Sequence, residues 1–168
     1  MSAVHVYPVA VIVLSDRAHS GERPDACIPV VREALASLDL EIDDERVIPD
    51  DAAQLQAALM ELCDGETRLV LTSGGTGLTF RDRTPQATAA VLDYEVPGIA
   101  EAMRAASQRH TPMAVLSRAV AGVRNRSLIV NLPGSPKAVR ETLHAIAEVL
   151  PHALEQLAGH ATDRHPAG

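Results

Sequence analysis

The sequence has very few aromatic residues, and this scarcity limits both its core and its ligands. Among 168 residues there is no tryptophan, one phenylalanine and two tyrosines. The core must therefore be built from aliphatic side chains, in a chain that is 46% apolar. Proteins that bind single-stranded nucleic acid stack the bases on aromatic side chains. We therefore do not expect this class of partner.

Positive charge is also in short supply. Lysine and arginine together number 15 against 22 acidic residues, which gives a formal net charge of −7. Nucleic acids and anionic membrane surfaces repel such a chain, so we expect neither as a partner. A phosphorylated small molecule would need a local site made of backbone N–H groups, a few basic side chains and a metal ion.

Cysteines and long apolar runs are equally scarce. Cys27 and Cys63 are far apart and form no CxxC motif, which favours two reduced, partly buried thiols. The seven histidines show no metal-ligand spacing, so we expect no zinc site. The longest apolar stretch, Pro8 to Leu14, is far shorter than a membrane-spanning helix, and no signal peptide is visible. We expect a cytoplasmic protein.

Strand and helix patterns alternate along the chain. Continuous β-branched or aliphatic runs predict buried strands at 9–14, 69–72 and 127–132, and looser patterns indicate strands at 40–48 and 115–123. Helical spacing predicts helices starting near Ile28, after Asp51, over 99–107 and after Ser135. Pro151 predicts a break before a last helical segment. This alternation predicts an α/β fold whose sheet is covered on both faces.

The sequence shows no internal domain boundary. The predicted connections are short and there is no repeat, so we expect residues 1–159 to form one domain. Residues 160–168 carry proline, histidine and charge without periodicity. We expect this tail to be disordered.

A glycine-rich turn follows the predicted strand 69–72. It reads Ser73-Gly74-Gly75-Thr76-Gly77, which matches neither a Walker A loop nor a dinucleotide fingerprint. Ligands of open α/β sheets bind beyond the carboxyl ends of strands, and glycines allow backbone N–H groups to face an anion. The alternative is a tight turn that binds nothing.

Two further segments, 81–85 and 131–137, could carry chemistry. Arg81-Asp82-Arg83 could hold Mg²⁺ and phosphate or form a surface ion-pair cluster, and Thr84-Pro85 resembles a helix cap followed by proline. In Asn131-Leu132-Pro133-Gly134-Ser135-Pro136-Lys137, a helix start offers an anion site. Lys137 opposes the helix dipole there, so it either serves a ligand or is simply solvated.

The acid pair Asp50-Asp51 divides into two predicted roles. Asp51 lies three residues before Gln54, the spacing of a capping box, so it should cap the next helix. Asp50 is then free to face the carboxyl edge of the sheet, although both acids could instead be solvated. Ser117, within Leu116-Ser117-Arg118, is polar inside an apolar stretch and could point into a site.

Taken in order, these motifs resemble those of the MogA/MoaB family of molybdopterin-binding proteins. The resemblance runs from about Val9 to Leu157 and also includes Ser15-Asp16 and Glu95-Val96-Pro97-Gly98. It implies a three-layer α/β/α sandwich with a mostly parallel central sheet, assembled as a trimer or hexamer. It further implies the Mg²⁺-dependent reaction of ATP with molybdopterin to give adenylyl-molybdopterin and pyrophosphate. The product would pass to a molybdate-inserting enzyme.

The resemblance also implies which residues form the site. Asp50 and Asp82 match the acids assigned to catalysis and metal binding. The residues that would bind pterin and nucleotide are Ser73, Gly74, Gly75, Thr76, Gly77, Ser117, Asn131, Pro133, Gly134, Ser135 and Lys137. The first loop departs from the family pattern, because no glycine follows Asp25 in Asp25-Ala26-Cys27-Ile28-Pro29. Two rivals are a trimer that binds molybdopterin or a nucleotide without catalysis, and a nucleotide pyrophosphatase of the same fold.

Overall fold

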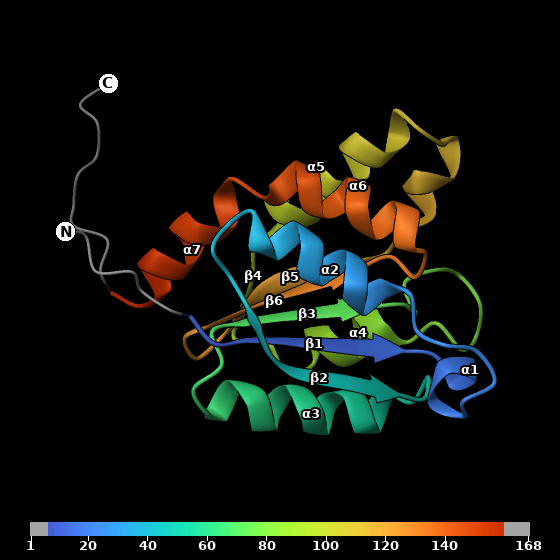
Figure 1. Cartoon of the computed structure of the whole chain (residues 1–168), viewed down its shortest axis with the longest axis horizontal. Helices are drawn as coiled ribbons and strands as arrows, with labels where there is room; N and C mark the ends of the chain where they lie inside the picture. The colour runs from blue at the N-terminus through green and yellow to red at the C-terminus, as the bar shows by residue number, and fades with distance from the viewer. Residues whose placement is uncertain (1–6, 160–168) are drawn as a thin grey trace.

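The computed structural model describes residues 7–159 and contains one six-stranded sheet (Figure 1). The strands lie in the order β2-β1-β3-β6-β5-β4. All run in the same direction except β5, which is antiparallel to both of its neighbours. Their bounds are β1 Val9–Leu14, β2 Ile42–Ile48, β3 Leu69–Ser73, β4 Tyr94–Glu95, β5 Ala121–Arg124 and β6 Ser127–Leu132.

Helices cover both faces of this sheet, which confirms the three-layer α/β/α prediction (Figure 1). One face packs against α2 (Cys27–Ala36), α5 (Pro97–Gln108), α6 (Pro136–Ile146) and α7 (Val149–Leu157), and the other against α3 (Ala52–Asp64) and α4 (Thr84–Ala89). Every residue of β1, β3 and β6 is buried, because both faces of these central strands are covered. Each fully buried aliphatic side chain stabilises the fold by roughly 1.5–3 kcal/mol.

The predicted helix starts at Asp51 and Ser135 are confirmed. The Asp51 side chain accepts a hydrogen bond from the Gln54 N–H at the start of α3. The Ser135 side chain accepts one from the Ala138 N–H at the start of α6. Both caps fix the position at which the chain turns from the sheet edge into a helix.

Three predictions about local structure are wrong. Residues 115–120 are not a strand: η1 (Pro112–Leu116) is a 3₁₀ helix whose first turn is capped by Thr111, and Val115 and Leu116 are exposed. Thr84 does not cap α4 but lies inside it, after Arg83. Pro151 does not precede the last helix but lies in the first turn of α7, where a missing N–H is tolerated. The predicted disordered tail lies outside the described residues.

The carboxyl ends of the parallel strands gather the predicted site segments at one edge. There β1 leads into α1 (Asp16–His19), β2 into Asp50, β3 into the glycine turn and β6 into Pro133. These four segments are distant in sequence and become neighbours because their strands are parallel and adjacent. None of the helices within residues 7–159 has the length and apolar character needed to cross a membrane.

Candidate active site

The glycine turn after β3 adopts a backbone that only glycine suits. Gly74 and Gly75 have φ values of +102° and +69°. A Cβ on Gly74 would lie 2.5 Å from the Leu14 carbonyl oxygen, and one on Gly75 would lie 2.3 Å from Thr84 Oγ1. The Gly74 N–H donates to the Leu132 carbonyl. The N–H groups of Gly75, Thr76 and Gly77 have no acceptor within residues 7–159, so this turn can receive an anion.

The turn after β6 lies directly against the glycine turn. Ser73 Oγ donates a 2.8 Å hydrogen bond to the Pro133 carbonyl oxygen, and a Cβ on Gly134 would lie 3.4 Å from Gly74 Cα. The Cys27 thiol at the start of α2 reaches the Gly134 carbonyl oxygen at 3.4 Å. The two predicted ligand-binding turns therefore form one continuous surface.

Two of the predicted site residues have side chains that are occupied inside the protein. Ser73 is 1% exposed and its hydroxyl is used by Pro133. Asn131 is fully buried, and its amide donates to the hydroxyls of Thr72 and Thr88, both at 2.9 Å. Its side-chain oxygen accepts from the Val120 N–H. These contacts tie β3, α4 and the segment before β5 together beneath the turns.

Asp50 is held by a reciprocal pair of hydrogen bonds with Asp16. The Asp50 N–H donates to Asp16 Oδ1 at 2.9 Å, and the Asp16 N–H donates to Asp50 Oδ2 at 3.2 Å. Arg81 donates to Asp16 Oδ2 at 2.5 Å. Asp16 therefore links the loops after β1 and β2 to the loop after the glycine turn. The sequence placed Ser15-Asp16 after a strand but gave no sign of this role.

The two acids of this pair have opposite pKa shifts. Burial raises the pKa of Asp50, repulsion from the Asp16 and Asp82 carboxylates adds to the rise, and the Asp16 N–H and Arg81 oppose it. The Asp50 N–H lowers the pKa of Asp16, and Arg81 lowers it further. Because desolvation and two neighbouring carboxylates disfavour its charge, Asp50 is an acid that a nearby cation would stabilise.

Asp82 closes the loop that follows the glycine turn. Its Oδ2 accepts from the N–H and the hydroxyl of Thr79, at 2.9 and 2.8 Å. The same oxygen lies 2.9 Å from the position a Cβ on Gly77 would take. Within residues 7–159 its other oxygen accepts no hydrogen bond, so Asp82 keeps one free ligand atom beside the glycine turn.

Arg118 fixes this loop from the opposite side. Its Nε donates to the Gly77 carbonyl oxygen at 2.8 Å and its Nη2 donates to the Asp82 carbonyl oxygen at 2.6 Å. Its own N–H donates to the Thr76 carbonyl. The two ends of the loop from Gly77 to Asp82 are thus held by one guanidinium group. The sequence marked Ser117 in this segment but missed Arg118, because its carbonyl partners are about forty residues away.

The acids fit a metal ion only if a substrate completes the site. In the part of the chain that the structure describes, no group of three or more His, Cys, Asp or Glu side chains could hold a metal. Asp50 and Asp82 nevertheless both lie beside the glycine turn: a Cβ on Gly75 would be 3.7 Å from Asp50 Oδ1, and one on Gly77 would be 2.9 Å from Asp82 Oδ2. Mg²⁺ commonly takes one or two carboxylates together with substrate phosphates. The donors present therefore suit a metal ion that arrives with a phosphorylated ligand.

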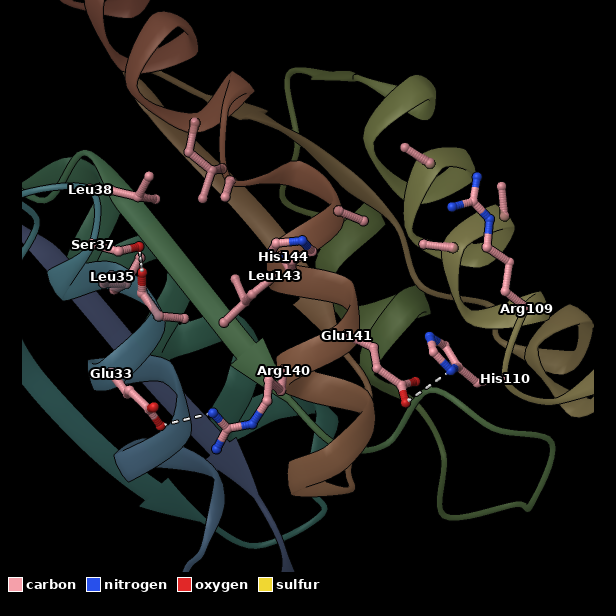
Figure 2. Close-up of a pocket in the computed structure, with 17 residues that line it drawn as sticks. Glu33, Leu35, Ser37, Leu38, Arg109, His110, Arg140, Glu141, Leu143 and His144 are labelled. Carbon is pink, nitrogen blue, oxygen red and sulfur yellow. Dashed lines mark hydrogen bonds and ion pairs between the residues drawn. The ribbon is translucent and has the colours of Figure 1, made fainter.

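A cavity of about 260 Å³ opens beside the turns, between α5, η1 and α6. Four predicted site residues line it: Thr76, Gly77, Ser117 and Pro133. The remaining predicted site residues do not line it. Among them, Ser135 caps α6, and Lys137 is largely exposed, with Nζ 4.0 Å from Glu141 Oε1. A larger cavity of about 720 Å³ lies between α2, α5 and α6 (Figure 2) and contains none of the predicted site residues.

The divergent first loop has a structural role for its acid. Asp25 accepts hydrogen bonds from the N–H groups of Cys27 and Ile28, at 3.0 and 2.8 Å. It therefore holds the first turn of α2, whose Cys27 in turn contacts the Gly134 turn.

These features define an α/β domain whose turns at the carboxyl edge of the sheet present unpaired backbone N–H groups beside two carboxylates. The sequence profile described as "Probable molybdopterin binding domain" matches residues 10–152, and the chain belongs to this family. Molybdopterin adenylyltransferase of Escherichia coli strain K12 is 44% identical over 83% of this chain and 73% of its own. The Helicobacter pylori J99 protein of that name is 38% identical, covering 95% of this chain and 90% of its own.

Solved structures show the same relationship. The molybdopterin biosynthesis enzyme MoaB of Thermus thermophilus superposes with a TM-score of 0.87 and 49% identity, covering 92% of this chain and 98% of that one. The molybdopterin biosynthesis Mog protein of Mycobacterium ulcerans has a TM-score of 0.85 and 40% identity, covering 90% and 99%. The predicted resemblance to the MogA/MoaB family is therefore confirmed.

Proposed function

We propose that this protein is a molybdopterin adenylyltransferase of molybdenum cofactor biosynthesis, which transfers the adenylyl group of ATP to molybdopterin in a Mg²⁺-dependent reaction. The observation that carries this proposal is the convergence of Asp50 and Asp82 on a glycine turn with three free N–H groups. A carrier that only binds its ligand does not need two carboxylates beside an anion site.

The proposed reaction joins two phosphate groups that both carry negative charge. A terminal phosphate oxygen of molybdopterin attacks the α-phosphorus of ATP, a new P–O–P bond forms, and the bond to the β-phosphate breaks to release pyrophosphate. The attacking oxygen is already a nucleophile, so no side chain has to remove a proton. The protein must instead neutralise charge and align the two phosphates.

The residues divide this work between them. Asp50 and Asp82 would hold Mg²⁺, which supplies positive charge to the phosphates when it is bound. The N–H groups of Gly75, Thr76 and Gly77 would orient a phosphate at the turn, and Lys137 and Ser135 would approach it from the start of α6. Ser73 and Asn131 would support the two turns from below, because their polar atoms are already used.

Assembly and partners rest on the family alone. We propose a homotrimer, or a hexamer made from trimers, which passes its product to a molybdate-inserting enzyme in the cytoplasm. From the net charge of −7 we expect neither nucleic acid nor an anionic membrane surface as a partner.

The decisive experiment incubates the purified protein with ATP, Mg²⁺ and molybdopterin. We expect adenylyl-molybdopterin and pyrophosphate in equal amounts, and none of either product with EDTA. Release of pyrophosphate from ATP without molybdopterin would instead indicate a pyrophosphatase. Binding of molybdopterin without any product would indicate a binding protein, and either result would refute the proposed transfer.

A further inference from the structure

The cavity beside the glycine turn contains one carboxylate, Glu141, that accepts no hydrogen bond from the residues the structure describes. Its walls are mainly apolar and include Ala100, Met103 and Leu116, a setting suited to a flat ring. Its charged lining residues are Arg104 and Glu141. Arg104 Nη1 already donates to the carbonyl oxygens of Ser117 and Ala119, at 3.4 and 3.0 Å. Glu141 is therefore the charged group left to meet a ligand.

Glu141 is placed to accept hydrogen bonds that the protein does not supply. Its side chain is only 15% exposed. Its Oε1 lies 3.8 Å from His110 Nδ1 and 4.0 Å from Lys137 Nζ, and both distances exceed hydrogen-bond length. Within residues 7–159 these two long ion pairs are the polar contacts of the Glu141 side chain, and neither is a hydrogen bond. Figure 2 shows Glu141 projecting from α6 toward His110. Glu141 lines both the larger and the smaller cavity.

We infer that Glu141 recognises the 2-amino-4-oxopyrimidine edge of a pterin bound in this cavity. That edge presents two parallel donors, the 2-amino group and the ring N3–H. A carboxylate accepts both at once in a charge-assisted pair. The inference rests on the proposed function, and it assigns the 260 Å³ cavity to the pterin rather than to the adenine of ATP.

The same carboxylate discriminates against adenine. Each hydrogen-bonding edge of adenine combines the 6-amino donor with a ring-nitrogen acceptor. Placed against Glu141, that acceptor would face a carboxylate oxygen, and one of the two hydrogen bonds would be replaced by repulsion. A site built to pair with two donors rejects an analogue that lacks one of them. Glu141 would therefore be a specificity-determining residue that selects the pterin over adenine in this cavity.

The test compares two probes, pterin and lumazine. Lumazine differs from pterin in that a carbonyl oxygen replaces the 2-amino group. Dissociation constants are measured by fluorescence titration for the wild type, Glu141→Gln and the control Glu33→Gln. Glu33 lies at the other side of the larger cavity and pairs with Arg140 at 2.9 Å. Glutamine is nearly isosteric with glutamate but replaces one acceptor with a donor.

We expect the wild type to bind pterin more tightly than lumazine. Glu141→Gln should weaken pterin binding by roughly 10- to 100-fold and remove most of the preference, whereas Glu33→Gln should behave as the wild type. ATP affinity should be the same in all three proteins. Thermal melts should also agree, since ion pairs as long as those of Glu141 contribute little.

Three results would overturn the inference: an unchanged preference in Glu141→Gln, a loss of ATP affinity in place of pterin affinity, or no pterin binding by the wild type at millimolar concentration. The adenylylation assay on the wild type is independent of these measurements. If it succeeds while Glu141→Gln keeps its pterin preference, the specificity role fails and the proposed function stands. If the adenylylation assay fails while the pterin preference depends on Glu141, the proposed function fails and the specificity role stands.

Discussion

Asp50 and Asp51 are adjacent, and their replacement should separate catalysis from stability. The Asp51 side chain accepts the Gln54 N–H at 2.9 Å and, among the described residues, forms no hydrogen bond with the glycine turn. Asp51→Ala should cost about 1 kcal/mol, within the usual 0.5–2 kcal/mol for a lost helix cap. For a domain of this size that is a fall in melting temperature of about 2–4 °C. Its rate of adenylylation should stay at the wild-type level.

Asp50→Asn should keep the stability of the protein and lose its activity. The asparagine oxygen can still accept the Asp16 N–H, and the substitution removes a carboxylate whose charge is disfavoured by burial and by Asp16 and Asp82. A raised pKa in the folded state means that the ionised Asp50 costs stability above the pKa of the unfolded chain, about 3.9. Asp50→Asn should therefore melt no lower than the wild type at neutral pH. Its advantage should disappear as the pH falls below about 4.

The assay is a pair of thermal melts at several pH values and a pair of adenylylation rates. Asp50→Asn should lose most of its rate, because the metal site loses one of its two carboxylates. If Asp50→Asn unfolds early at neutral pH while Asp51→Ala is folded and inactive, the two roles have been exchanged, and the geometry of this turn has been misread.

Four further outcomes are expected. Asp82→Asn should remain folded by circular dichroism but lose several kcal/mol of transition-state stabilisation, and near-normal turnover would exclude a metal role. Gly75→Ala should lower the free energy of unfolding in urea by more than about 1 kcal/mol, since it combines a left-handed φ with a collision at Thr84 Oγ1. Arg118→Gln should cost about 1–3 kcal/mol in stability and slow adenylylation, because the loop from Gly77 to Asp82 loses both anchors; equal rates would show that the loop is held by other contacts. Light scattering should give the mass of a trimer or hexamer, and a monomer at micromolar concentration would contradict the family-based expectation.

The sequence predicted the parts of the fold that depend on local pattern. The central strands were visible because both of their faces are buried, so their residues are continuously apolar. The caps at Asp51 and Ser135 were visible because the partner N–H lies three residues away. The exposed apolar residues of η1 led to the wrong prediction of a strand. A single sequence does not distinguish exposed valine and leucine from buried ones.

Sequence reasoning could relate candidate site residues to one another only where they lie in one segment. The glycine turn and Asp82 lie within ten residues of each other and could be read together. The contact between Asp16 and Asp50 joins residues 34 apart, and the contact of Arg118 with Gly77 joins residues 41 apart. These contacts depend on which strands are neighbours in the sheet, and the chain order does not state this.

The two outer strands of the sheet limit how copies of this chain can associate. On β2 the exposed positions carry Asp43 and Glu45, and Arg46 is neutralised by Asp44 and Glu61. At the other side β4 is only two residues long. A charged edge and a very short edge both discourage a strand of another molecule from adding to the sheet. Any assembly should therefore be made through helix and loop surfaces. The protein should resist edge-to-edge association of its sheets even when it is concentrated.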